Sequence, residues 1–157
     1  MTRVRWSAKQ DGSVISLLRC FKSTHTITSV YFTEELVANI LIVEDSPSQA
    51  LALKRLLEKH GHDSYLAADG EQCLEMARAK QPDLVLMDII MPNLNGFQAT
   101  RKLSKDEKTK HIPVVILTTK DMESDRVWGM RQGAQAYLTK PFNEEELVGV
   151  IKDLLAA

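Results

Sequence analysis

The chain has 157 residues, of which 44% are hydrophobic and 26% are charged, so it can bury one core and does not require two. Its formal net charge of −1 gives no support for a nucleic acid or an anionic membrane as a partner, and we expect neither. Because no apolar run approaches the roughly 20 residues that a bilayer requires, and because no signal-peptide pattern opens the chain, we predict a cytoplasmic protein.

Residues 1–39 show none of the regular pattern that follows them. They carry five Lys or Arg residues against three Asp or Glu residues, and their β-like stretches are too short for a domain. Three interpretations stay open: an ordered arm that covers a sheet edge, a disordered extension, or upstream or vector sequence translated in frame. We favour the last, with residues 40–157 as the domain, because Val37 could be encoded by a GTG initiator.

From Ile40 onward, short apolar runs alternate with segments of helical period, which is typical of an α/β sheet with crossover helices. Strands are predicted at 40–43, 63–67, 84–87, 114–117 and 136–138. Most of these runs are apolar on both faces, as in a parallel sheet that is covered by helices. The sequence therefore predicts a doubly wound α/β domain with five parallel strands.

The helices between these strands have recognisable starts and ends. The first has Ser46 as its candidate N-cap, Pro47 at the first helical position and Gly61 as its stop. The others are predicted within DGEQCLEMARAKQP and at 95–103, 122–132 and 143–155. We expect Cys73 to be a reduced thiol whose side chain helps its helix to pack against the rest of the domain. We expect Trp128 to pack in the same way rather than to contact a partner.

Polar residues follow the carboxyl ends of four strands, where open parallel sheets bind their ligands. Glu44 and Asp45 follow the first strand, Asp88 follows the third, and Thr118 and Lys140 end the fourth and fifth. Clustered carboxylates repel one another unless they share a cation, and a set of oxygen ligands favours Mg²⁺. The sequence therefore predicts a Mg²⁺ site at this edge of the sheet.

Asp88 needs a particular explanation, because it ends an apolar strand and is followed at once by IIMPNLNG. A carboxylate nucleophile can accept a phosphoryl group and form an acyl phosphate. The phosphoryl oxygens then need countercharge and hydrogen-bond donors, which Mg²⁺, Lys140 and Thr118 can supply. We predict that Asp88 is a phosphoryl acceptor and that Lys140 is an exposed lysine that contributes little to folding.

Four segments, ILIVEDS, DLVLMDIIMPNLNG, VVILTT and GAQAYLTKPF, together resemble the receiver domain of two-component response regulators, from Ile40 to about Leu155. The resemblance implies a flavodoxin-like sheet with the strand order 2-1-3-4-5. It also implies the following roles: phosphorylation site Asp88, acidic pair Glu44 and Asp45 for Mg²⁺, backbone-carbonyl ligand Ile90, switch hydroxyl Thr118, phosphate-binding Lys140 and switch aromatic Tyr137.

Two longer stretches, MDIIMPNLNGFQATRKL and TTKDMESDRVWGMRQGAQAYLTKPF, are similar to PilH-type regulators of type IV pili and twitching motility. This similarity implies a CheA-like histidine kinase as phosphodonor and a downstream motility protein as target. Because the chain ends one helix after Lys140, we expect no output domain and a signal that leaves by protein contact. By resemblance, the contact face carries Arg126, Met130, Tyr137 and Thr139.

Two alternatives to this function stay open. The protein could be a phosphate sink that drains a shared kinase, or an interaction module that holds Mg²⁺ without being phosphorylated. Apart from its own phosphorylation and dephosphorylation, no enzyme activity is expected. A phosphatase of the haloacid dehalogenase type is disfavoured, because the second aspartate of that family, two positions after the nucleophile, is here Ile90.

Overall fold

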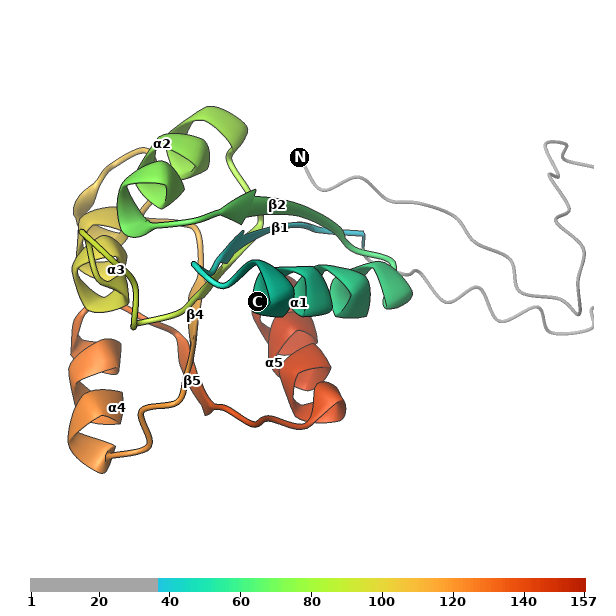
Figure 1. Ribbon diagram of the computed structural model, residues 1–157. Helices are drawn as coiled ribbons and strands as arrows, with labels where there is room; N and C mark the ends of the chain where they lie inside the picture. The colour runs from blue at the N-terminus through green and yellow to red at the C-terminus, as the bar shows by residue number, and fades with distance from the viewer. Residues whose placement is uncertain (1–36) are drawn as a thin grey trace, which may run out of the picture.

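The computed structural model describes residues 37–157, which form one sheet with helices on both faces (Figure 1). The hypotheses about residues 1–36 lie outside the described residues. The strands are β1 (Asn39–Val43), β2 (Asp63–Ala67), β3 (Leu84–Met87), β4 (Val114–Thr118) and β5 (Ala136–Thr139). The helices are α1 (Pro47–Lys59), α2 (Gly70–Lys80), α3 (Gly96–Lys105), α4 (Glu123–Arg131) and α5 (Glu144–Ala156).

The five strands are all parallel and lie in the order β2-β1-β3-β4-β5. This order confirms the predicted doubly wound, flavodoxin-like fold. The strand order reverses between β1 and β3, because β2 is added on one side of β1 and β3 on the other. The chain segments that leave β1 and β3 therefore meet at the same edge, where such folds bind ligands. Among residues 37–157, no helix is both long enough and apolar enough to cross a membrane.

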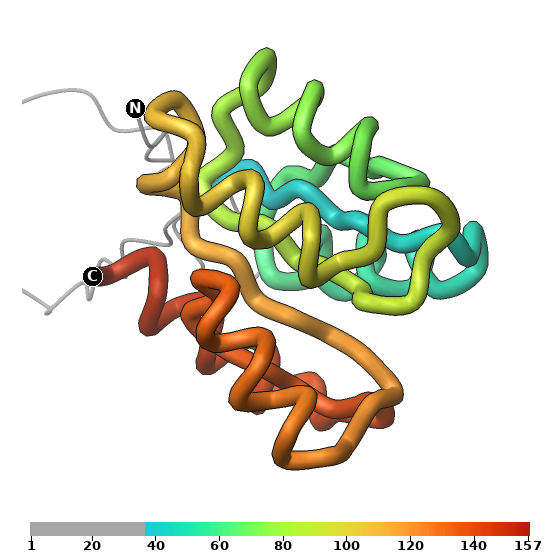
Figure 2. The backbone as a smooth tube through the Cα atoms, turned by 90° about the vertical axis from the view of Figure 1, so that its left-hand side faces the viewer, coloured from blue at the N-terminus to red at the C-terminus, as the bar shows by residue number. Residues whose placement is uncertain are grey.

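The two faces of the sheet bury two separate sets of side chains. On β1, Ile40 and Ile42 pack with α1 and α5, while Leu41 and Val43 pack with α2 and α3. Figure 2 looks onto the layer of α2, α3 and α4, with the strands behind it. Strand side chains alternate between faces, so a run that is apolar at every position is what a sheet covered on both faces requires. Each fully buried Leu or Ile side chain contributes about 1.5–3 kcal/mol to folding.

β1 begins at Asn39, one residue earlier than predicted, because both backbone groups of Asn39 form hydrogen bonds with Asp83. The Asn39 backbone N–H donates to Asp83 Oδ2 at 2.8 Å, and the Asn39 carbonyl accepts from the Asp83 N–H at 2.8 Å. The preceding Ala38 is fully buried, its N–H donates to His62 Nδ1 at 3.3 Å, and its carbonyl accepts from the Asp63 N–H at 2.9 Å. Asn39 is therefore part of the sheet and Ala38 is bonded beside it, although the prediction assigned both to the N-terminal extension.

The helix starts lie at the predicted positions or one residue after them, and one expected cap is not used. Ser46 precedes α1 and Pro47 opens it, but the Ser46 side chain makes no capping bond and instead contacts Ser48 Oγ at 3.1 Å. Asp69 caps α2, and Asn95 caps α3 in a reciprocal capping box with Gln98. The predicted starts of the last three helices were one residue early, because those residues are caps with extended backbone.

Candidate functional site

Three carboxylates meet where β1 and β3 end. Glu44 and Asp45 follow β1, Asp88 follows β3, and one carboxylate oxygen from each lies within 4.8 Å of the others. The Glu44 side chain is 1% exposed and that of Asp88 is 11% exposed, whereas Asp45 is exposed. The structure thus brings together the three acids that the sequence predicted to meet.

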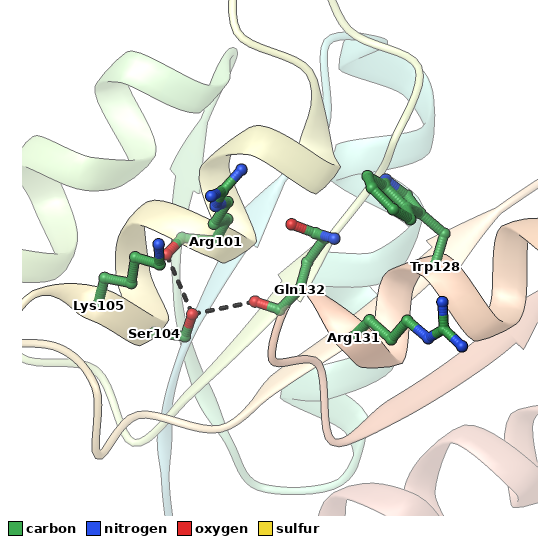
Figure 3. A pocket seen from close by; sticks show the side chains of 6 residues that line it. All are labelled: Arg101, Ser104, Lys105, Trp128, Arg131 and Gln132. Atoms are coloured by element: carbon green, nitrogen blue, oxygen red, sulfur yellow. Dashed lines mark hydrogen bonds between the residues drawn. The ribbon is translucent and has the colours of Figure 1, made fainter.

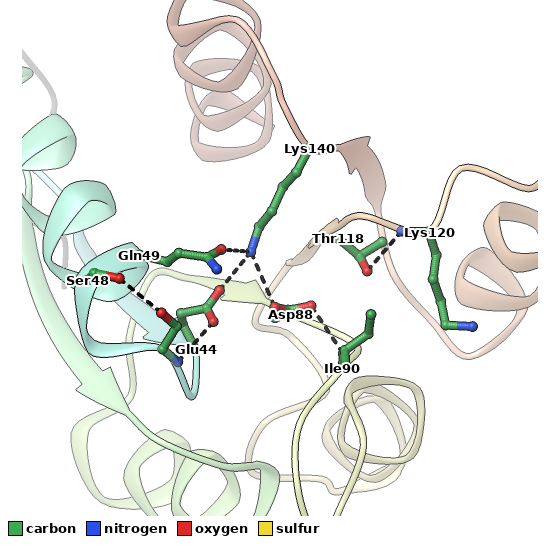
Figure 4. Close-up of polar contacts among 9 residues, drawn as sticks. Glu44, Ser48, Gln49, Asp88, Ile90, Thr118, Lys120 and Lys140 are labelled. Atoms are coloured by element: carbon green, nitrogen blue, oxygen red, sulfur yellow. Dashed lines mark hydrogen bonds and ion pairs between the residues drawn. The ribbon is translucent and has the colours of Figure 1, made fainter.

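Lys140 reaches this cluster from the end of β5 (Figure 4). Its Nζ donates to Glu44 Oε2 at 2.7 Å, to Gln49 Oε1 at 2.8 Å and to Asp88 Oδ2 at 3.2 Å. The Lys140 side chain is only 13% exposed. The expectation of an exposed lysine was wrong, because three acceptors from separate elements draw the ammonium inward.

The fold alters the ionisation of Glu44. Burial raises the pKa of its carboxyl above the ordinary value of 4.5, because the charged form loses water. The hydrogen bond from Lys140 and the backbone N–H of Ser46, which donates at 3.1 Å, lower the pKa and offset part of that rise. Glu44 therefore depends on its partners for its charge.

Gln49 belongs to the site but was not predicted from the sequence. It lies in the first turn of α1, and its side-chain oxygen accepts a hydrogen bond from Lys140 Nζ. The available signal was its position: the helix that follows the acidic pair must place its first turn beside the same sheet edge. A neutral glutamine in that turn gives no charge or metal-ligand pattern that would mark it.

Thr118 ends β4 beside the strand that carries Lys140. Thr118 pairs with Thr139 in the sheet, and the Thr118 carbonyl accepts from the Lys140 backbone N–H at 2.7 Å. The Thr118 hydroxyl is fully buried and accepts from the Lys120 backbone N–H at 3.3 Å. Its donor hydrogen stays available for another acceptor, as the predicted role requires.

Ile90 contacts the site through its backbone. Its N–H donates to Asp88 Oδ1 at 3.1 Å, so the two oxygens of Asp88 are held by different donors. The Ile90 side chain is 53% exposed and offers no hydrogen bond. The role of its carbonyl as a metal ligand stays a prediction.

The backbone that carries Asp88 is held closely by the start of α3. A Cβ added at Gly96 would collide with the Asp88 carbonyl oxygen and would lie 2.7 Å from Ile89 Cα. The Gly96 N–H also donates to the Ile89 carbonyl at 3.1 Å. Only glycine permits this approach, so α3 starts directly against the loop of the acidic cluster.

The predicted contact face is only partly at the surface. Arg126 and Met130 on α4 are exposed, and Thr139 is half-buried. Tyr137 is 3% exposed, and its hydroxyl donates to the Lys120 carbonyl at 2.9 Å; burial raises its pKa to about 12. Tyr137 therefore lies inside the molecule in this structure, where it cannot contact a partner directly.

Trp128 corrects another expectation. The sequence favoured packing, but the Trp128 side chain is 50% exposed. The residue that packs inward from α4 is its neighbour Gly129, where an added Cβ would lie 2.8 Å from Ile116 Cδ1 and 3.2 Å from Tyr137 Cδ2. With glycine at the buried position, the helix lies too close to the sheet for the indole to turn underneath it.

The comparisons with known proteins agree with this fold. Protein PilH of Pseudomonas aeruginosa is 57% identical over 120 residues, which cover 76% of this chain and 99% of PilH. The solved structure of chemotaxis protein CheY4 of Vibrio cholerae is 30% identical, with a TM-score of 0.71, over 75% of this chain and 98% of that chain.

A second solved structure is the receiver domain of a sensor histidine kinase from Pseudomonas aeruginosa PAO1, with a magnesium ion coordinated in its active-site cleft. It is 31% identical, with a TM-score of 0.72, over 77% of this chain and 99% of that chain. The family model of the response regulator receiver domain matches residues 40–152. Since that match spans most of the chain, the chain belongs to the response regulator receiver domain family.

Proposed function

We propose that this protein is a response regulator that accepts a phosphoryl group from a histidine kinase on Asp88 and passes its signal on by protein contact. The observation that carries the proposal is the contact of Lys140 Nζ with Asp88 Oδ2 at 3.2 Å, beside two further acids. A lone carboxylate at a strand end would have no need of a lysine from a strand two places away in the sheet.

Each residue of the site has a part in the transfer. An Asp88 oxygen attacks phosphorus, the bond between phosphorus and the kinase imidazole nitrogen breaks, and an acyl phosphate forms on Asp88. The Ile90 N–H orients one Asp88 oxygen, while the Lys140 ammonium stabilises charge on the incoming group. The Thr118 hydroxyl would donate to a phosphoryl oxygen.

The donor set also fits a magnesium ion. Glu44, Asp45 and Asp88 offer only oxygen ligands, which Mg²⁺ prefers, and their oxygens lie close enough to share one ion. Mg²⁺ bound there would supply countercharge for the phosphoryl oxygens. Lys140 already neutralises part of Glu44, so Mg²⁺ and the ammonium would share that carboxylate.

The identity to PilH over nearly its whole length supports a finer assignment. We propose that the pathway is a chemosensory system for type IV pili and twitching motility, with a CheA-like kinase as donor and a motility protein as target, in the cytoplasm. The protein would turn over no separate substrate. Arg126 and Met130, both exposed on α4, would contact the target.

The experiment is incubation with acetyl phosphate and MgCl₂, followed by intact mass spectrometry. The wild type should gain one phosphoryl group, and Asp88→Asn should gain none. Asp63→Asn is the matched control, because Asp63 is exposed and starts β2 at the opposite end of the strands. A gain that persists in Asp88→Asn, or that survives EDTA, would contradict the proposal.

A further inference from the structure

A cavity lies between α3 and α4, and none of the residues of the acidic cluster lines it. Its volume is about 360 Å³, and six side chains line it (Figure 3): Arg101, Ser104 and Lys105 from α3, Trp128 and Arg131 from α4, and Gln132, which caps α4. Each helix, taken with its cap, contributes positions i, i+3 and i+4, which share one helical face. The cavity is therefore the meeting of two facing helix surfaces.

Three of the lining side chains are cations without a counterion. Arg101, Lys105 and Arg131 form no ion pair within residues 37–157. Asp106 follows Lys105 in sequence, but its carboxylate already accepts from Arg78 Nε at 2.6 Å. The whole chain has a formal charge of −1, so this positive patch stands out on a slightly acidic protein.

Helix ends explain only part of this arrangement. Lys105 and Arg131 are the last residues of their helices, where a cation stabilises the exposed carbonyls. Arg101 lies in the middle of α3, where that effect has faded. The indole of Trp128, half-exposed beside these cations, has no such explanation.

The cavity lies on a different side of α4 from the predicted contact face. Successive residues turn by about 100° around a helix, so Trp128 and Met130 flank the buried Gly129 on opposite sides. Trp128 faces α3 and lines the cavity, whereas Met130 faces away from it. An occupant of the cavity would not need the surface of Arg126 and Met130.

The two helices are held together at the base of the cavity. Ser104 Oγ donates to the Gln132 carbonyl at 3.0 Å (Figure 3). Gly133 follows with a φ of +107°, and an added Cβ there would lie 2.6 Å from Ser104 Cβ. The cavity is therefore already formed, which lowers the cost of ordering side chains when a partner binds.

We propose that this α3–α4 cavity docks an acidic segment of a partner protein, with an apolar side chain against Trp128 and carboxylates on Arg101, Lys105 and Arg131. Five of the six lining residues are polar or charged, unlike the mainly apolar lining of small-molecule sites. Arginine and tryptophan are the residues that dominate protein interfaces. Residues 1–36 are not a matching occupant, because they carry five cations against three acids.

The experiment uses Trp128 as its own reporter. Trp6→Phe leaves Trp128 as the one tryptophan of the chain, and its fluorescence is titrated with the capped peptide EEDFEDE at low ionic strength. We expect a saturable change in the Trp128 fluorescence with EEDFEDE, a weaker one with EEDGEDE and none with KKRFKRK. The affinity for EEDFEDE should fall as salt is added. Asp88 does not line the cavity, so the Asp88→Asn variant should bind EEDFEDE as well as the parent chain does. The docking proposal can therefore fail while the proposed phosphorylation of Asp88 holds, and the reverse.

Charge variants test the named residues. The affinity for EEDFEDE should fall by about two- to fivefold in each of three variants, Arg101→Gln, Lys105→Gln and Arg131→Gln. Lys102→Gln is the matched control, since Lys102 is exposed on the same helix but lies outside the cavity lining. No saturable change with EEDFEDE, equal binding of KKRFKRK, or an equal loss in Lys102→Gln would overturn the proposal.

Two further measurements test other occupants. A higher affinity for AMP or for oligo-dT than for EEDFEDE would assign the cavity to nucleotides or nucleic acid and overturn the proposal. A shift in the size-exclusion volume of Trp128→Ala relative to the parent chain would assign the surface to self-association, with the same consequence. An unchanged elution volume and no response to AMP or oligo-dT support an acidic protein segment.

Discussion

Lys140 and Glu44 form an ion pair of 2.7 Å between residues 96 positions apart, and both side chains are largely withdrawn from water. Removing one partner of such a pair leaves the other charge buried without compensation. The pair therefore concerns stability as well as chemistry, contrary to the expectation of a lysine that contributes little to folding.

We predict that Lys140→Ala lowers the free energy of unfolding by about 1–3 kcal/mol near neutral pH. The pKa of Glu44 is already raised by burial, and loss of Lys140 removes a cause that lowers it. A raised pKa means that the contribution of Glu44 is complete below its unfolded pKa of about 4.5 and is lost as pH rises through the folded pKa. The variant should therefore lose less stability near pH 4.5 than near pH 7, as measured by urea unfolding.

Two variants control this measurement. Lys152→Ala, at an exposed position without an ion pair among the described residues, should change stability by less than about 0.5 kcal/mol. Adding Glu44→Gln to Lys140→Ala should restore part of the loss, because the uncompensated charge is gone. An equal loss at both pH values would show that lost packing, and not charge, sets the effect.

The lifetime of the acyl phosphate should depend on Ile90 and Lys120. Hydrolysis requires a water held in line with the phosphorus, and neither side chain offers an acceptor that could orient it. The Ile90 side chain is 53% exposed, and within residues 37–157 the Lys120 side chain makes a single ion pair, a long one of 3.8 Å with Asp125. We expect slow loss of phosphate in the wild type and about tenfold faster loss in Ile90→Asn with Lys120→Glu, which corresponds to about 1.4 kcal/mol of barrier.

The decay is followed by intact mass after removal of acetyl phosphate. Ile90→Val with Lys120→Arg is the conservative control and should keep the wild-type rate. The backbone bonds of Lys120 to Thr118 and Tyr137 do not involve its side chain, so the site itself should survive both changes. Unchanged or slower decay in the first variant would exclude these positions as determinants of the lifetime.

Residues before Val37 should be dispensable for folding and phosphorylation. A chain that begins with methionine and Val37 keeps Ala38 and Asn39, whose backbone groups bond His62, Asp63 and Asp83. Its urea midpoint and acetyl phosphate uptake should match those of the full chain. A chain that begins at Ile40 loses those bonds and should be less stable by about 2 kcal/mol or more. Insolubility or altered assembly of the Val37 chain would favour an ordered arm over upstream translation.

Cys73 should be inert in the folded protein. It is fully buried in α2, and burial raises its pKa to about 12 from 9.0. In Cys20→Ser, which leaves one thiol, we expect no reaction with a disulfide reagent at pH 8 within minutes and complete reaction in denaturant. Stability should fall between pH 9 and pH 12, because only the unfolded thiol ionises there. Rapid labelling without denaturant would place Cys73 in a segment that opens locally.

The strands and the acidic cluster could be predicted from the sequence because both follow from local pattern. Ile40 to Val43 is apolar at every position, and the acids come directly after such runs. The burial of Lys140 could not be predicted in this way, since it depends on Gln49 and Glu44, which approach only in the folded sheet. A lysine alone in sequence carries no sign of its acceptors.

The exposure of Trp128 was beyond local pattern for a related reason. An aromatic residue in a helix of mixed character packs unless something else fills the inward position, and here Gly129 fills it. The unused cap of Ser46 has a local cause instead, because the Ser46 hydroxyl contacts Ser48 Oγ and the Ser46 N–H donates to Glu44 Oε1, each two residues away. At Trp128 the tertiary contacts of its neighbour outweigh the intrinsic preference of the residue, whereas at Ser46 local contacts do so.

The tight contact of Gly96 with the backbone of Asp88 links the orientation of α3 to the position of that backbone. Its ten residues span about 15 Å, so a tilt of about 4° at Gly96 would displace the far end at Lys105 by about 1 Å. Because the Asp88 carbonyl and the start of α3 are already in close contact, the backbone of Asp88 cannot shift toward the helix unless the helix tilts. A substitution at Asp88 that leaves its backbone in place would therefore leave the α3–α4 cavity unchanged, whereas a backbone shift that tilted α3 would move Arg101, Ser104 and Lys105 relative to α4.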